Sequence, residues 1–194
     1  MSESVRFIII TVPPTDVSAR IDAARRAVAA LTGSVSALAY PPHVTLRTGV
    51  RVPAAALPQF LDDFKRVVGE WRPFPVSTDG FLRTTYESES AVQWLIGYRI
   101  RKDEALSALN RRLLSYVPFR VSDRLDFRPH LTLAFEDLTM EAFFRAGRYM
   151  EKRPPEIPET FQWECDNVGL YRLEDGLWTP YVVFRQEPGK ASAA

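Results

Sequence analysis

Histidine and cysteine are scarce in this 194-residue chain, which contains two histidines and one cysteine, Cys165. A single cysteine excludes an intramolecular disulfide and a cysteine-rich zinc site, and it is typical of a protein of the reducing cytoplasm. Two histidines without clustered cysteines or carboxylates at ligand spacing are too few for an ordinary zinc centre. We therefore expect no metal and no other cofactor, although Glu136 is the nearest carboxylate that could complete a zinc site.

Excess charge and long hydrophobic runs are also missing. Lysine and arginine total 25 against 24 aspartates and glutamates, a net charge of +1, so no overall field favours duplex DNA or an anionic membrane. The apolar run over residues 7–12 is too short to span a membrane, and it reaches Pro13 without a cleavage pattern. We expect a cytoplasmic monomer that binds neither membranes nor duplex DNA.

The hydrophobic fraction of 46% is ordinary for a globular protein, and the chain is long enough to bury a sizeable core. The apolar residues show the continuous or alternating runs of strands and the wider spacing of amphipathic helices. In chain order they predict strand 5–12, helix 16–31 ended by Gly33, strand 43–50, helix 57–68, and strand 74–86 with a break at Asp79 and Gly80. They then predict strand 91–98, helix 106–117, strand 130–135, helix 140–150, and strands 160–173 and 178–185 around Gly176.

One short pattern occurs twice and contains both histidines. Its copies read Tyr40-Pro41-Pro42-His43-Val44-Thr45-Leu46 and Phe127-Arg128-Pro129-His130-Leu131-Thr132-Leu133. A shift of 87 positions superposes the two histidines, and it also places predicted helix on helix and strand on strand. We infer an internal duplication, with repeats over residues 5–86 and 91–173 and a final strand 178–185. The prediction is a single bilobal domain over residues 1–187 followed by a disordered tail, 188–194.

The spacing within each motif places its histidine and threonine on one face of a strand, because side chains two positions apart point the same way. His43 would then share a face with Thr45, and His130 with Thr132. The aliphatic residues that alternate with them would face the core: Val44, Leu46, Leu131 and Leu133. If the repeats bring the two strands together, two imidazoles can divide the acid and base roles while two hydroxyls donate to an anionic oxygen. That set suits a phosphate ester.

Residues next to the motifs are further candidates for contact with a substrate. Arg47 continues the alternation beyond Thr45, where the second motif has Ala134, and its guanidinium could hold a phosphate oxygen or simply face solvent at the cleft edge. Weaker candidates are two aromatics that could stack on a base or merely pack the strand entry, an arginine, and a tyrosine from a late strand: Tyr40, Phe127, Arg128 and Tyr171.

The two motifs resemble the paired His-x-Thr-x signature of the 2H phosphoesterase superfamily, which includes the RNA 2′,3′-cyclic phosphodiesterases. The resemblance implies an α+β fold with two lobes, two antiparallel sheets, outer helices and a central cleft. It also implies metal-independent catalysis with His130 as base and His43 as acid, and with Thr45 and Thr132 binding the phosphate. The motifs here continue as Arg-Thr-Gly and Ala-Phe-Glu instead of Phe-x-Gly and Ala-Arg, so the chain resembles a divergent member.

The leading prediction is therefore hydrolysis of a 2′,3′-cyclic phosphate, in a cyclic nucleotide or at an RNA terminus. Two alternatives stay open from the residues. One is a non-catalytic module that binds nucleotides or RNA ends on the same fold. The other is a phosphodiesterase that cleaves linear 2′-5′ or 3′-5′ oligonucleotides.

Overall fold

The computed structural model describes residues 4–69, 71–87, 92–116 and 127–186. These ranges contain two short 3-10 helices, Ser36–Ala39 and Ala54–Ala56, which precede β2 and α2. The main elements are β1 Ser4–Thr11, α1 Thr15–Thr32, β2 Val44–Pro53, α2 Leu57–Gly69, β3 Phe74–Glu87, β4 Val92–Ile100, α3 Glu104–Tyr116, β5 His130–Ala134, α4 Met140–Met150, β6 Gln162–Cys165, β7 Asn167–Glu174 and β8 Leu177–Arg185.

Every predicted helix and strand has a counterpart in this order, with small differences at the ends. Gly33 ends α1 in the left-handed conformation, at φ 79°, as a residue without Cβ can. The predicted break at Gly80 is a shift of register inside a continuous β3, and the predicted strand 160–173 is divided into β6 and β7. Position 91, position 117 and the tail 188–194 lie outside the described residues.

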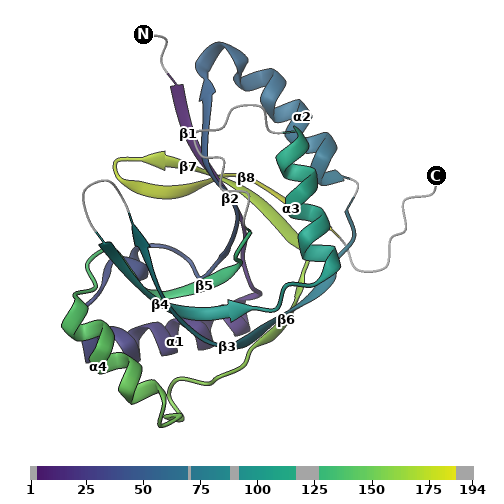
Figure 1. Cartoon of the computed structure of the whole chain (residues 1–194). Coiled ribbons are helices and arrows are strands. Elements are labelled where there is room, and N and C mark those ends of the chain that lie inside the picture. The colour runs from purple at the N-terminus through teal and green to yellow at the C-terminus, as the bar shows by residue number, and fades with distance from the viewer. Residues whose placement is uncertain (1–3, 70, 88–91, 117–126, 187–194) are drawn as a thin grey trace.

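The strands of the described ranges form one curled, antiparallel sheet of eight in the order β6-β3-β4-β5-β2-β1-β7-β8. Helices α1 and α4 pack together against the β4 and β5 side, while α2 and α3 pack together against the β2 side (Figure 1). The predicted fold class is confirmed, with one difference. The two expected sheets are joined edge to edge through β2 and β5, where Val44 pairs with Leu131.

The pairing register has the twofold symmetry that a duplication predicts. A shift of 87 residues relates β1 to β4, β2 to β5 and β3 to β7. When the two members of each pair are exchanged, the strand order β3-β4-β5-β2-β1-β7 becomes the same order read in reverse. Two strand pairs, Val44 with Leu131 and Val76 with Trp163, join residues that are themselves 87 positions apart, so both lie on the axis. The axis therefore passes between the two histidine motifs. The boundaries of the two repeats remain a prediction.

The core lies between the sheet and its helices. The four motif residues predicted to face it, Val44, Leu46, Leu131 and Leu133, are at most 2% exposed. Burying each such aliphatic side chain stabilises the fold by about 1.5–3 kcal/mol, so packing fixes which way the alternating histidines and threonines point. Two large apolar residues of α4 are exposed, Met140 by 57% and Phe144 by 47%.

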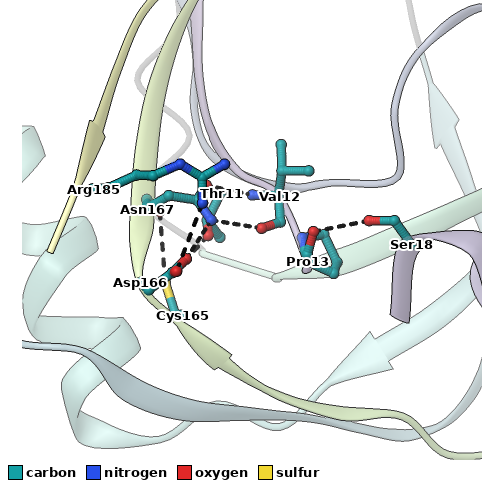
Figure 2. Close-up of polar contacts among 8 residues, drawn as sticks. All are labelled: Thr11, Val12, Pro13, Ser18, Cys165, Asp166, Asn167 and Arg185. Atoms are coloured by element: carbon teal, nitrogen blue, oxygen red, sulfur yellow. Dashed lines mark hydrogen bonds and ion pairs between the residues drawn. The ribbon is translucent and has the colours of Figure 1, made fainter. Parts of the chain in front are cut away.

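Past Ile10, which is the last residue of β1 paired with β7, the chain is held by side chains on either side of the bend between β6 and β7 (Figure 2). The Asn167 amide accepts from the Val12 N–H at 3.0 Å and donates to the Val12 carbonyl at 2.7 Å, replacing a backbone pair with a side chain. Thr11 Oγ1 lies 3.2 Å from the sulfur of the buried Cys165. These contacts fix the turn that leads from β1 into α1.

Candidate active site

The β2–β5 junction brings the two motifs together. With Val44 paired to Leu131, the antiparallel register sets His43 beside Thr132 and Thr45 beside His130, on the face opposite the core. The neighbouring strand β4 extends both rows, because its Arg99 pairs with His130 and its Gly97 pairs with Thr132. Each row thus contains one histidine and one threonine, one from each repeat.

The two imidazoles are oriented in the same way. Nδ1 of His43 lies 2.8 Å from the carbonyl oxygen of Pro41, and Nδ1 of His130 lies 2.9 Å from that of Arg128. A carbonyl oxygen only accepts, so each Nδ1 carries the proton and each Nε2 presents a lone pair. Both contacts reach the carbonyl two residues before the histidine. The motif itself therefore sets the tautomer and leaves Nε2 available for acid–base work.

Burial keeps both histidines neutral at physiological pH. The pKa of His43 is lowered to about 4, mainly by desolvation and to a smaller extent by the charges of Arg25 and His130, while its hydrogen bond to Pro41 opposes the shift. Desolvation also lowers the pKa of His130, against its hydrogen bond to Arg128. An anion between the rings would raise both pKa values, because it favours the charged imidazolium. The site is therefore suited to gain a proton when it binds a phosphate.

The guanidinium of Arg25, on α1, holds the backbone of both motifs, and the residue is only 1% exposed. Its Nε donates to the Thr132 carbonyl at 3.1 Å, and its Nη1 donates to the Tyr40 carbonyl at 2.7 Å and to Asp22 Oδ1 at 3.2 Å. One planar group with fixed donors thus sets the positions of both strands. Burial lowers the pKa of Arg25, and its hydrogen bond to Asp22 opposes that shift.

A close backbone approach at Gly97 extends the row that contains His43 and Thr132. A Cβ added there would clash with the carbonyl oxygen of Leu131, which belongs to the strand that carries His130 and Thr132. Glycine is required because the backbones of β4 and β5 meet without room for a side chain. Any larger residue would displace β5 and, with it, the side chains of His130 and Thr132.

A cavity of about 740 Å³ opens beside the junction. Thr45, His130 and Arg47 line it, together with the loop over residues 127–129, the end of β4 and part of β3. The ring of Tyr86 also lines it, with its centroid 6.3 Å from that of His130. The volume suits a nucleotide-sized ligand. His43 and Thr132 do not line the cavity, because they form the neighbouring row.

Some of the other predicted candidates line the cavity and some do not. Arg47 lines the cavity and is only 8% exposed, which excludes the alternative of a solvent-facing charge. Phe127 and Arg128 line it as well. Tyr40 and Tyr171 do not. Tyr171 packs against Gly169, and burial raises the pKa of its hydroxyl; the pKa of Tyr40 is raised by burial and by the charge of Glu136.

Sequence reasoning missed Arg25, and it also missed Arg99 and Lys102, which line the cavity. Arg25 had a readable signal. It follows Ile21 by four residues and precedes Val28 by three, so it lies on the buried stripe of an amphipathic helix. A charge on such a stripe needs partners that satisfy it. Arg99 and Lys102 carried no signal, because only the strand pairing brings them beside the second motif.

Two further properties concern the described residues only. In the described parts of the chain, no group of three or more histidine, cysteine, aspartate or glutamate side chains is arranged to hold a metal ion. None of the helices in those ranges is both long enough and apolar enough to cross a membrane.

Comparisons with known proteins agree with this geometry. A "Putative phosphoesterase" of Geobacillus kaustophilus is 25% identical over 145 residues, which cover 74% of this chain and 78% of that protein. The crystal structure of E. coli LigT complexed with 3′-AMP superposes with a TM-score of 0.62 at 18% identity, covering 95% of this chain and 99% of LigT. That of TT0787 from Thermus thermophilus gives 0.63 at 19% identity, covering 93% and 97%.

These structural likenesses show a shared fold, and the curated relatives support the assignment of this chain as a phosphoesterase. A sequence profile of the 2′-5′ RNA ligase superfamily matches residues 13–177, which is most of the chain. The protein therefore belongs to the 2′-5′ RNA ligase superfamily, the 2H phosphoesterases that its two motifs resemble.

Proposed function

We propose that this protein hydrolyses 2′,3′-cyclic phosphates of nucleotides or RNA ends, using His43 and His130 as an acid–base pair and no metal. The observation that carries the proposal is the matched pair of imidazoles. Their Nδ1 atoms are held 2.8 and 2.9 Å from backbone carbonyls, which leaves both Nε2 atoms for the reaction. Among structural neighbours, LigT has been crystallised with 3′-AMP and with ATP, which supports a nucleotide as the ligand.

In the proposed reaction, Nε2 of His130 removes a proton from a water molecule as its oxygen attacks phosphorus. The bond from phosphorus to one ribose oxygen breaks, and that oxygen takes a proton from Nε2 of His43. The product is a phosphomonoester with a free ribose hydroxyl. Thr45 and Thr132 donate to the non-bridging oxygens, where negative charge accumulates. The assignment of base and acid follows the family resemblance.

The acid role sets a condition on His43. With a pKa of about 4 in the empty site, this imidazole is almost entirely neutral at pH 7. It therefore carries a proton there only after the anionic phosphate raises its pKa. Because kcat/KM reports the free enzyme and both histidine pKa values are lowered, kcat/KM should be greatest below pH 6.5. The profile of kcat, which reports the complex, should lie at higher pH.

The proposal is tested with purified protein in EDTA and the four nucleoside 2′,3′-cyclic monophosphates, with chromatographic separation of 2′- and 3′-phosphate products. We expect turnover that falls about 10²–10⁴-fold in both His43→Ala and His130→Ala. The product isomer would identify the bond that breaks. Activity that disappears with EDTA and returns with zinc would contradict the mechanism. Binding by calorimetry without turnover of cyclic phosphates would instead indicate a binding module.

A further inference from the structure

The cavity beside His130 is strongly basic. Among the described residues, four cationic side chains line it, and no aspartate or glutamate does: Arg47, Arg99, Lys102 and Arg128. A cyclic phosphate carries a single negative charge, and the paired histidines and threonines already face it. Arg99 and Lys102 therefore bring positive charge to the cavity in addition to the groups that face the reacting phosphate.

The positions that the twofold axis relates to this lining carry little positive charge. The counterparts of the four cations, 87 residues away in the sequence, are uncharged: Ala134, Val12, Thr15 and Pro41. Among the counterparts of all the lining residues, one is basic, Arg172 in place of Thr85. Its Nε lies 3.3 Å from Glu174 Oε1, so its charge is paired. The two motifs are symmetric, but their electrostatic surroundings are not.

Arg99 is placed to contact a group next to the reacting phosphate. It pairs with His130 across β4 and β5, so the two side chains share a face on strands about 4.8 Å apart. Its Nη1 makes a long contact of 3.4 Å with the Asp79 carbonyl, and the side chain is exposed. Lys102 follows shortly after the end of β4 and is also exposed. Both lie on the side of His130 away from His43.

We propose that this cavity is a subsite for a second phosphate of the substrate, bound by Arg99 and Lys102. This inference rests on the proposed function. With the cyclic phosphate between the histidines, the second phosphate is the one attached to the 5′ oxygen of the same nucleoside. That phosphate is either the linkage to the preceding nucleotide of an oligonucleotide or a terminal 5′-phosphate. The preferred substrate is then an end that carries both groups, and a nucleoside 2′,3′-cyclic monophosphate is a truncated substrate.

The test compares four synthetic substrates by kcat/KM at low salt: adenosine 2′,3′-cyclic phosphate, its 5′-phosphorylated form, the dinucleotide ApA 2′,3′-cyclic phosphate, and the same dinucleotide with an uncharged methylphosphonate linkage. The two dinucleotides differ in charge and hardly in size. We expect the charged dinucleotide to exceed the neutral one about tenfold, the size of a hydrogen bond between a phosphate and a partly exposed cation. The 5′-phosphorylated mononucleotide distinguishes a terminal phosphate from an internal linkage.

Variants then assign the preference to residues. Arg99→Gln and Lys102→Gln should each reduce the ratio of charged to neutral dinucleotide severalfold, and the double variant should bring it close to one. Arg172→Gln, the basic counterpart across the axis, should leave the ratio unchanged. Equal turnover of both dinucleotides by the native protein would overturn the subsite and leave the proposed function intact. Failure to hydrolyse any of the four substrates would overturn both.

Discussion

Acidification should destabilise this protein through His43, and the size of the effect follows from its burial. The pKa of His43 is about 4 in the folded protein, against 6.5 for an unperturbed histidine. As the pH falls below 6.5, the unfolded chain takes up a proton that the folded chain refuses, so folding free energy is lost. The loss is complete below pH 4. At about 1.4 kcal/mol per pKa unit, it amounts to roughly 3 kcal/mol in all.

The informative perturbation is His43→Asn, because the asparagine amide keeps a donor near the position of Nδ1 for the Pro41 carbonyl but does not titrate. When the pH is lowered from 7 to 5, linkage predicts that protonation of His43 in the unfolded chain reduces the unfolding free energy of the native protein by about 2 kcal/mol. The variant has no His43 and should not show this reduction. His130 contributes equally to both proteins, and the chain has only these two histidines.

The assay is urea unfolding of both proteins at pH 7 and pH 5, with the free energy of unfolding extrapolated to water. The native protein should lose about 2 kcal/mol more than His43→Asn between the two pH values. Equal losses would refute the claim that His43 is held neutral in the folded state. A larger loss in the variant would reverse the sign of the shift.

Three further predictions concern groups around the site. Arg25→Met leaves two motif carbonyls without their buried donor, so urea unfolding should show a loss of about 3 kcal/mol and kcat should fall; an unchanged kcat would mean that Arg25 does not position the motifs. Gly97→Ala should lower activity and cost about 1–3 kcal/mol, whereas Gly69→Ala, which meets no neighbouring atom, should be harmless to both. Burial raises the pKa of Cys165 to about 12, so a maleimide should label it only on unfolding, and rapid labelling of the native protein would show that the thiol is accessible.

Much of the fold could be predicted from the sequence, because the two motifs show both the offset between the repeats and the alternation of side chains along each strand. The 87-residue offset between the histidines reappears in the structure as the two strand pairs on the axis. The alternation of Val44 and Leu46 with His43 and Thr45 identified the core-facing side of β2 correctly, since burial of the aliphatic residues determines the face.

The sequence could not show how the strands of the two repeats join in one sheet or which residues surround the motifs. Whether β2 and β5 pair directly depends on packing of the whole sheet, and this contact decides that Arg99 stands beside His130. Tyr171 had the composition of a substrate-binding residue, yet it is only 8% exposed and packs against Gly169. Arg25 looked like one of several charges on a helix. Only its position on the apolar stripe, read together with the structure, distinguishes it.

The central claim, that one site uses both imidazoles, is tested most directly by NMR of the two histidines. Because the chain has only two, single substitutions assign every ring signal. Titration with adenosine 3′-monophosphate should shift both rings with the same dissociation constant. Both pKa values should lie below 6.5 in the free protein and rise in the complex. A response from only one ring, or two different dissociation constants, would contradict a shared two-histidine site.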